Sequence, residues 1–368
     1  MRVFTLDVGS GTQDFMLAEF DLESVKTESE TESESKSSFC KNIRNSLKMI
    51  LPSPTRIVAS KIRKSKNVFL YGYTMGGGAC KKAAFEHAKK YRVLASEKAA
   101  LTFSDNLERV KKAGIEICSS TGIEKELKDK KEFTAIEMKD VDWEFFMRTF
   151  DSLSVDYPEV SIVAVQDHGY SKEKSNRKFR FELFEKKLKK GASLSDFVYE
   201  SENVPEVYNR MASVAESYED FGKKFGKLYI VDTVFAAMAG CLREVKRPAL
   251  VMNFGNSHFV GAVVGEDGQI LSMFEHHTKV IEKKVREKGI EWVADFIGRF
   301  LRGEIDFDDV YNDGGHGAYV RDVVDVRDII STGPRVELSP FKVAGSCGEV
   351  MITGNIGMLN LLSLYLRR

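Results

Sequence analysis

The chemistry-bearing residues nearest the N-terminus form a short Gly-rich segment, Asp7-Val8-Gly9-Ser10-Gly11-Thr12, which follows a strand-like apolar run. Glycines in such a turn let backbone N–H groups approach phosphate oxygens, and a carboxylate at the strand end can hold Mg²⁺ directly or through water. Alone the motif is weak, because turns are rich in Gly, Asp and Ser for conformational reasons. It nevertheless predicts a phosphate loop.

A second segment of the same design occurs in the other half of the chain, Asn253-Phe254-Gly255-Asn256-Ser257-His258. It can be laid over the first, with Asn253 matching Asp7 and Gly255 matching Gly9. Each segment lies between a strand and a returning strand, within 2–17 and 249–264. Two such hairpins would clamp a phosphate chain from both sides, and Asn253 makes the clamp asymmetric because it carries no charge.

Three consecutive glycines, Gly76, Gly77 and Gly78, precede a strongly helical stretch at 79–91. Amides at a strand-to-helix junction can point at an anion, so this segment is a candidate second phosphate contact. A tight turn that needs positive φ accounts for the glycines equally well.

The elements that must position these residues alternate between strands and helices. The pattern predicts strands at 1–6, 55–59, 67–72 and 227–232, a buried strand in the apolar run at 160–169 that ends in polar groups, and a helix with small residues at 233–240. A run of Glu, Ser, Thr and Lys at about 23–38 predicts a mobile surface loop inserted between two strands of a hairpin. The basic stretch at 175–181 is interpreted as a solvated face, with an anion grip by Arg177 and Arg180 as the alternative.

The bulk properties limit the classes of function. A chain of 368 residues predicts two lobes or domains, and 55 basic against 55 acidic residues give no electropositive surface for nucleic acid. No stretch approaches the roughly 20 apolar residues of a membrane span. We therefore expect neither nucleic acid nor membrane as a partner.

The cysteines and the N-terminus bear on the compartment. Cys40, Cys80, Cys118, Cys241 and Cys347 are odd in number, are widely scattered and include no C-x-x-C pair. They are interpreted as reduced cytoplasmic thiols and not as a disulfide framework. The first residues predict a strand and not a secretion leader, which also favours a cytoplasmic protein.

The paired hairpins make the chain resemble the actin, sugar kinase and Hsp70 superfamily, whose hallmark is five segments in fixed order. The resemblance implies an α/β actin-like ATPase fold with two ribonuclease H-like lobes around a central cleft. The five segments would be the phosphate segments 6–14 and 253–258, the connecting helices 232–240 and 353 to the C-terminus, and the adenosine segment 329–335 with Gly333. The lobes would be 1–244, with an inserted subdomain, and 245–368.

More narrowly, the whole chain resembles a bacterial and archaeal family labelled pyruvate formate-lyase activating-enzyme-like. The segments 75–78, 165–169, 275–278 and 314–317 carry that resemblance. A radical activating enzyme of that kind needs three closely spaced cysteines for its iron–sulfur cluster, and the sequence has no such triplet. We therefore do not expect that activity.

The superfamily resemblance suggests roles for the acidic residues. Asp7 is the candidate to hold the metal, and Asp14 or Asp232 is the candidate base or water-orienting group for phosphoryl transfer. These roles rest on position alone.

Five of the six histidines lie in turns beside apolar strands: His168, His258, His276, His277 and His316. If strand ends face a central cleft, several imidazoles would converge with Asp167 and Glu275 on a metal or a substrate. The alternative is that each histidine orients its own turn. Neighbouring residues of a strand face opposite sides, so only one of His276 and His277 would face the cleft. The predicted metal-binding set is Asp7, Asp167, His168, Glu275, His276 and His316.

The leading functional hypothesis is a protein that binds ATP and Mg²⁺, or another divalent metal, and couples ATP hydrolysis or phosphoryl transfer to closure of the two lobes. Hydrolysis would either drive a conformational change in a protein partner or pass the phosphate to a small substrate. One alternative keeps the fold and uses the His- and Asp-lined cleft as a metal-dependent hydrolase or small-molecule binding module. Another is a non-catalytic scaffold, which Asn253 favours.

Overall fold

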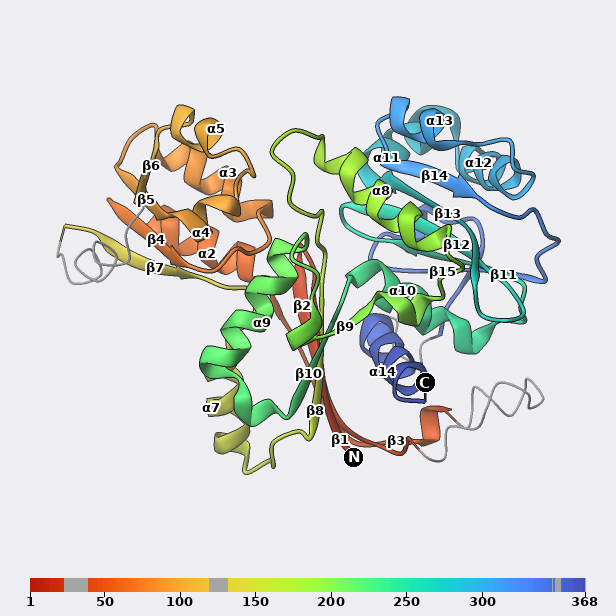
Figure 1. The fold of residues 1–368 in the computed structure, drawn as a ribbon, viewed down its shortest axis with the longest axis horizontal. Coiled ribbons are helices and arrows are strands. Elements are labelled where there is room, and N and C mark those ends of the chain that lie inside the picture. Colours follow the sequence, from red (N-terminus) through yellow and green to blue (C-terminus); the bar gives the residue numbers. More distant parts are fainter. Residues whose placement is uncertain (23–38, 119–131, 346, 348–351, 368) are drawn as a thin grey trace.

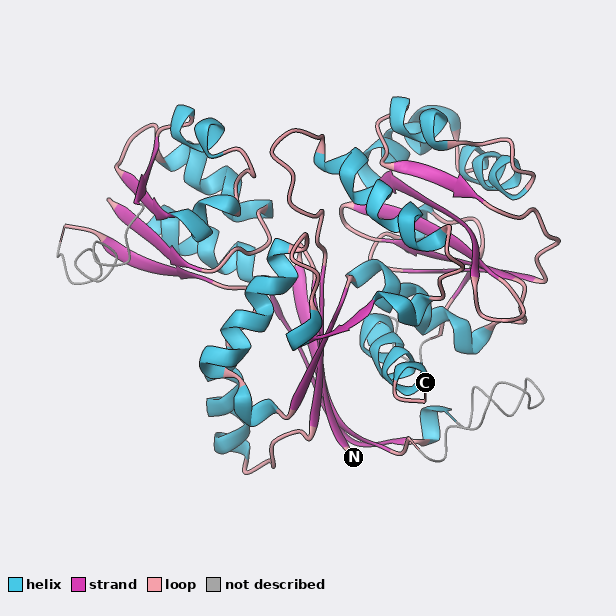
Figure 2. Cartoon of the chain, viewed as in Figure 1, coloured by secondary structure: helices cyan, strands magenta, loops and turns pink. Residues whose placement is uncertain are grey.

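The computed structural model describes residues 1–22, 39–118, 132–345, 347 and 352–367. The predicted loop at 23–38 lies outside these residues. The described chain contains two six-stranded sheets and one four-stranded sheet, with helices between and around them. Figure 1 shows the four-stranded sheet at the upper left, the first six-stranded sheet at the lower centre and the second at the upper right, and Figure 2 shows the same elements by type.

The first sheet holds the N-terminal strand near its centre. From one edge to the other its strands are β3 (Ile43–Pro52), β2 (Thr12–Phe20), β1 (Arg2–Val8), β8 (Val160–Val165), β10 (Lys227–Val231) and β9 (Val198–Glu200). The pairs β1–β2 and β2–β3 are antiparallel, whereas β1–β8 and β8–β10 are parallel.

The second sheet repeats this plan. Its strands are β14 (Gly317–Val320), β13 (Ile270–His277), β12 (His258–Val264), β11 (Ala249–Phe254), β15 (Asp328–Thr332) and β16 (Lys342–Val343). The pairs β11–β12 and β12–β13 are antiparallel, whereas β11–β15 and β15–β16 are parallel.

Five strands of each sheet therefore follow the order third, second, first, fourth, fifth, with the same pattern of directions. The order is β3-β2-β1-β8-β10 in the first sheet and β13-β12-β11-β15-β16 in the second. This duplicated ribonuclease H-like arrangement confirms the predicted actin-like fold. In both sheets the turn that follows the central strand is one of the two Gly-rich segments.

Two helices lie between the six-stranded sheets, as Figure 1 shows: α10 (Thr233–Cys241) and α14 (Thr353–Tyr365). Their apolar side chains share one buried core with residues of both sheets. The helices cross closely, because a Cβ built on Gly357 would lie 1.8 Å from the Ala236 carbonyl oxygen. A side chain there would push the two helices apart.

Other helices cover the outer faces of the two six-stranded sheets. Helices α7 (Trp143–Leu153) and α9 (Asn209–Phe221) contribute to the outer core of the first sheet, and α11 (Thr278–Lys288) and α12 (Glu291–Leu301) to that of the second. Helix α8 (Asn176–Leu188) lies between β8 and β10 in the chain yet packs against β13 and β14. Helix α13 (Phe307–Asn312) precedes β14. Short 3₁₀ segments occupy 194–197, 201–203, 223–225, 242–244 and 336–338.

The four-stranded sheet is a subdomain inserted between β3 and β8. Its strands, all parallel, are β6 (Ile115–Cys118), β5 (Val93–Ser96), β4 (Val68–Gly72) and β7 (Thr134–Met138), and its helices are α2 (Pro54–Lys64), α3 (Gly78–His87), α4 (Glu97–Leu101) and α5 (Leu107–Lys112). It has a core of its own. We retain the division of the chain at 244/245 as a proposal, since it falls just before β11.

Two local predictions are wrong. Residues 55–59, predicted as a strand, belong to helix α2, because Pro54 occupies the first helical turn, where its missing N–H costs nothing. Cys40 and Cys347, predicted as free thiols, form a disulfide with Cα atoms 5.6 Å apart, and Cys80, Cys118 and Cys241 are free. A separation of 307 residues gives no sequence signal for such a pair.

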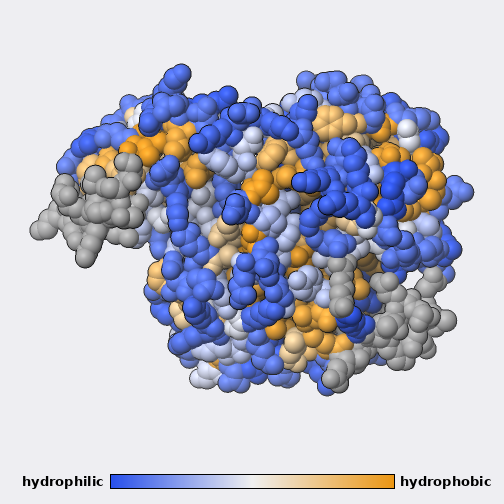
Figure 3. Space-filling model, in the orientation of Figure 1, coloured by the Kyte–Doolittle hydropathy of each residue, from blue (hydrophilic) through white to orange (hydrophobic). Residues whose placement is uncertain are grey.

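The helices of the described chain all lack the length or the apolar character needed to cross a bilayer. On the face shown in Figure 3, hydrophilic residues cover most of the surface, and hydrophobic residues appear mainly in smaller areas between them.

Candidate functional site in the cleft between the sheets

Two carboxylates lie on the strands that flank the first hairpin turn. Asp7 on β1 and Asp14 on β2 are cross-strand partners, so their side chains lie on the same face. The Gly9 N–H donates to the Thr12 carbonyl at 3.0 Å, and the Ser53 hydroxyl donates to the Gly9 carbonyl at 2.7 Å. These bonds fix the turn before any ligand arrives.

Both carboxyl groups titrate above their ordinary range. Burial, together with the nearby carboxylates of Asp14 and Asp232, raises the pKa of Asp7 to about 8. Burial raises the pKa of Asp14 to about 6, although the Thr12 hydroxyl donates to it at 3.3 Å. Among the described residues, Asp14 Oδ1 is buried with no hydrogen-bond partner. Two such groups suit a bound cation, which would supply the missing charge.

The second hairpin turn is built in the same way. The Gly255 N–H donates to the His258 carbonyl at 2.9 Å, and the Thr278 hydroxyl donates to the Gly255 carbonyl at 2.7 Å. Asn253 stands at the end of β11 beside Gly333, which has a φ of +108°. A Cβ on Gly333 would lie 2.5 Å from Asn253 Oδ1, so only glycine fits there.

The two turns face each other across a cleft. The Ser257 and Ser10 hydroxyls are 3.4 Å apart, and a Cβ built on Gly11 would lie 3.2 Å from Asn256 Nδ2. A cavity of about 130 Å³ lies between the turns. Its walls include most of the predicted phosphate and carboxylate residues: Asp7, Gly9, Ser10, Thr12, Asp14, Asn253, Gly255, Asn256, Ser257, His258 and Gly333.

A larger cavity of about 230 Å³ adjoins the first and shares Gly9, Ser10 and His258 with it. Gly76, Gly77 and Gly78 line this second cavity, where the inserted subdomain meets the first sheet. The Gly76 N–H donates to Asp140 at 3.1 Å, and Gly77 is the N-cap of α3. The triple glycine and the hairpin of the first sheet therefore line the same space.

Arg210 and Asp140, which the sequence did not single out, support this second cavity. The Arg210 guanidinium donates to Asp140 at 2.6 and 2.9 Å and to the Gln166 carbonyl at 2.7 Å. Arg210 lies in the first turn of helix α9 without any recognisable motif, so only the fold reveals that it reaches the cleft.

Asp167 and Asp232 are engaged by the protein itself. Asp167 accepts hydrogen bonds from the N–H groups of Gly169, Arg210 and Met211 at 2.8–2.9 Å, and burial raises its pKa to about 6. Asp232 caps α10 and accepts from the Arg180 guanidinium at 2.6 and 3.0 Å. The role of Asp232 as a base stays a prediction, and its carboxylate is held by Arg180 and by the helix cap.

Arg180 joins the two halves of the molecule. It is 0% exposed and binds Asp232 at the start of α10 and Glu275 on β13, the latter at 2.9 and 3.0 Å. Both interpretations of Arg180, as a solvated side chain and as an anion grip, are therefore wrong. The guanidinium carbon of Arg177 lies 4.6 Å from the centroid of the Tyr311 ring, and the guanidinium donates to the Gly315 carbonyl at 2.7 Å.

Two predicted metal ligands point elsewhere. Both Glu275 oxygens accept from Arg180, and burial raises the pKa of Glu275 to about 7. His276 Nε2 lies 3.4 Å from an Asp313 carboxylate oxygen, away from the other imidazoles. The structure does not bring Glu275 and His276 together with the other predicted ligands, because Arg180 binds the first and the second faces Asp313.

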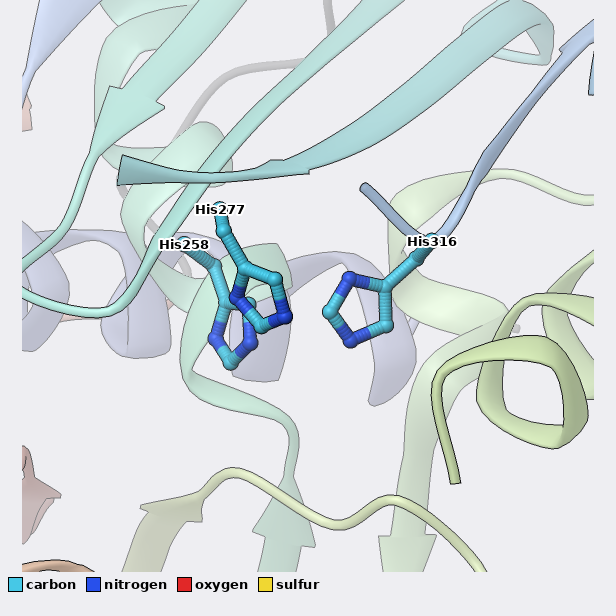
Figure 4. Close-up of side chains that lie close together, drawn as sticks. All are labelled: His258, His277 and His316. Carbon is cyan, nitrogen blue, oxygen red and sulfur yellow. The ribbon is translucent and has the colours of Figure 1, made fainter. Parts of the chain in front are cut away.

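His277, and not the predicted His276, lies with His258 and His316. Its imidazole and those of His258 and His316 each offer a ring nitrogen within 4.8 Å of the others (Figure 4). His168 lies beside them, with its ring stacked on His316 at 6.1 Å between centroids. Strand alternation predicted that one of the pair would face the cleft, but only the register of β13 identifies which.

The sequence matches, over residues 75–338, the family described as "Putative pyruvate format-lyase activating enzyme (DUF1786)". None of the curated proteins matches the chain.

The solved structures that are similar to the chain include the following three. An exopolyphosphatase-like protein is 11% identical to this chain, with a TM-score of 0.28. The similarity covers 91% of this chain and 67% of that chain. Two structures of the Aquifex aeolicus Ppx/GppA family are 9% and 8% identical with TM-scores of 0.32 and 0.34. They cover all of this chain and 92% and 90% of theirs. The fold assignment rests instead on the strand order of the two sheets. Because the family match spans well over half of the sequence, the chain belongs to the family DUF1786.

Proposed function

We propose that the cleft binds the phosphates of a nucleoside triphosphate such as ATP together with Mg²⁺, and hydrolyses or transfers the terminal phosphoryl group. The observation that carries this proposal is the opposition of two Gly-rich hairpin turns across one cavity, with Ser10 and Ser257 3.4 Å apart. Backbone N–H groups and hydroxyls on both sides suit an extended anion, which would bridge the two sheets.

The two carboxyl groups fit a bound magnesium ion. Neither Asp7 nor Asp14 has an ion-pair partner among the described residues, although both are enclosed and close to each other. Carboxylate oxygens, water and phosphate oxygens are the ligands that Mg²⁺ prefers. Bound there, Mg²⁺ would neutralise negative charge on the phosphates. Asp7 is the residue proposed to hold it.

Asp14 is the proposed proton acceptor for the attacking water or hydroxyl. A pKa of about 6 lies close to neutral pH, as an efficient general base requires. The Thr12 hydroxyl, 3.3 Å away, orients the carboxylate toward the cavity. Asp14 is preferred to Asp232 for this role because Asp232 is already paired with Arg180. The acceptor of the phosphoryl group is water, a small molecule or a protein partner.

A thermal-shift titration tests nucleotide binding. We expect Mg-ATP to stabilise the parent protein by about 2.7 kcal/mol at a hundred times its dissociation constant, with a raised melting temperature. AMP, which lacks the bridging phosphates, should give a much smaller shift. The release of inorganic phosphate from ATP, followed in the same samples, reports turnover.

Matched variants locate the binding. Gly11→Val adds a branched side chain between the two turns and should abolish the ATP-dependent shift. Gly298→Val makes the same chemical change on outer helix α12, where only the flexible Arg302 head lies near, and should keep the shift. An absent shift in the parent protein, or an equal shift in Gly11→Val, would contradict the proposal.

A further inference from the structure

The imidazoles of His258, His277 and His316 come together at one end of the second sheet, as Figure 4 shows. His258 opens β12 and His277 closes β13, and the two residues are register partners on adjacent strands. His316 precedes β14, and its N–H donates to the Glu275 carbonyl at 2.8 Å. The sheet itself therefore sets the spacing of all three rings.

The three imidazoles differ in their hydrogen bonds. The Gln166 amide contacts His258 Nδ1, and His277 bonds to the backbone of Ser257. His316 is 0% exposed, yet among the described residues neither of its ring nitrogens has a partner. His276, by contrast, accepts from the His277 N–H at 2.9 Å and so orients its own turn. A buried polar group without a partner is costly and calls for an explanation such as a bound ion.

We propose that His258, His277 and His316 bind a divalent transition metal, of the class of zinc or ferrous iron, with a fourth coordination position left open toward the cleft. Ring centroids are 5.0 Å apart for His258 and His277 and 4.7 Å apart for the other two pairs. A tetrahedral site with bonds of about 2.0–2.1 Å holds its nitrogens about 3.4 Å apart. Small ring rotations would close this spacing.

The ligand set selects the metal. Imidazole nitrogen suits zinc, iron, nickel and copper, whereas Mg²⁺ prefers oxygen. The site is therefore distinct from the magnesium site proposed at Asp7, and it does not depend on nucleotide binding. Three protein ligands with one open position are typical of a catalytic site and not of a closed structural one.

The protonation state of the rings supports the same conclusion. The pKa of His258 is lowered mainly by burial and also by the neighbouring imidazoles of His316 and His168. Burial lowers the pKa of His277 as well. The pKa of His316 is lowered mainly by burial and also by the positive charge of Arg180. Neutral imidazole is the form that binds metal, so no proton has to leave at neutral pH.

The charged groups around the cluster indicate the fourth ligand. Arg180 faces the rings but is paired with Asp232 and Glu275, and Arg177 donates to the Gly315 carbonyl. Three neutral imidazoles leave the metal its full charge. An anionic oxygen ligand, such as hydroxide or a phosphate oxygen, therefore suits the open position. His258 lines both cavities, which places the site at the wall of the proposed phosphate cleft.

Metal retention by the full-length protein tests this inference without nucleotide. Protein stripped with EDTA would be incubated with Zn²⁺, Co²⁺ or, without oxygen, Fe²⁺, in excess Mg²⁺, desalted and analysed for metal. We expect about one bound metal ion per chain. His316→Ala and His277→Ala should each lower retention at least tenfold, while His87→Ala, at a buried histidine on α3, should not.

Bound Co²⁺ adds a readout that a merely structural histidine would not give. A tetrahedral cobalt site has intense visible absorption, which should appear in the parent protein and in His87→Ala and be lost in both cluster variants. His277 is half-buried, so His277→Ala keeps the test open if His316→Ala fails to fold. No retained metal in the parent protein, or equal retention in folded His277→Ala, would overturn the site.

Discussion

Asp7→Asn is expected to make the protein more stable at pH 8 while removing its Mg-dependent turnover of nucleotide. The reason is that the enclosed carboxyl of Asp7 has its pKa raised to about 8 in the folded protein, from an ordinary value of 3.8. Between these two values the unfolded chain releases the proton and the folded chain retains it. Folding stability contributed by this group therefore falls as the pH rises from about 4 to 8.

The amide of asparagine keeps the size of the side chain, which packs closely against Gly354, and removes the titration. At pH 8 in EDTA, the free energy of unfolding should rise on the order of 2 kcal/mol. This gain is smaller than the whole pKa shift would give at ~1.4 kcal/mol per unit, because water reaches the cavity. Turnover with Mg-ATP should fall at least about 100-fold, since the cation loses its carboxylate.

Urea denaturation at pH 5 and pH 8 measures the first effect. The gain in Asp7→Asn should be larger at pH 8 than at pH 5, and Asp325→Asn, at an exposed carboxyl, should show no such difference. A variant that is less stable than the parent at pH 8, or that keeps full turnover, would contradict the role given to Asp7.

Arg180→Met is expected to destabilise the protein by about 3–5 kcal/mol, the usual cost of leaving a buried charge without its partner. Arg180, Asp232 and Glu275 are almost completely buried, and the guanidinium binds both carboxylates. Its removal leaves two carboxylates in an apolar environment between α8, α10 and β13. Lower pH should partly restore stability, because protonation of Glu275, whose pKa is already raised to about 7 by burial, removes one charge.

The free energy of unfolding of three variants checks this expectation. The triple change Arg180→Met, Asp232→Asn, Glu275→Gln removes every charge of the group and should recover much of the loss. Arg299→Met breaks only an exposed pair with Glu304 and should cost less than about 1 kcal/mol. A loss in Arg180→Met no larger than that in Arg299→Met would show that the buried group does not hold the two halves together.

The sequence predicted the duplicated hairpins because their information is local. A strand, a Gly-containing turn and a returning strand occupy only about 16 residues, and the register follows from the turn. The superfamily resemblance then supplied the global arrangement of the two sheets. The helix at 54–64 was missed for a local reason, since the β-prone residues outweighed the Pro54 start signal.

The contacts that the sequence did not reveal connect distant segments. Arg180 meets Glu275 across 95 positions, and Cys40 meets Cys347 across 307. A basic side chain in a charged stretch usually faces water, and nothing local indicates that Arg180 is enclosed. Likewise, His276 and His277 are indistinguishable until the pairing of β12 with β13 assigns each to a face.

A crystal structure of the protein with Mg²⁺ and a non-hydrolysable ATP analogue would show whether the cleft holds nucleotide phosphates. We expect the phosphates to lie between 9–12 and 255–258, with backbone N–H groups of both turns donating to them and Mg²⁺ held at Asp7. A nucleotide bound elsewhere, or a cleft that holds only water at saturating nucleotide, would contradict this expectation.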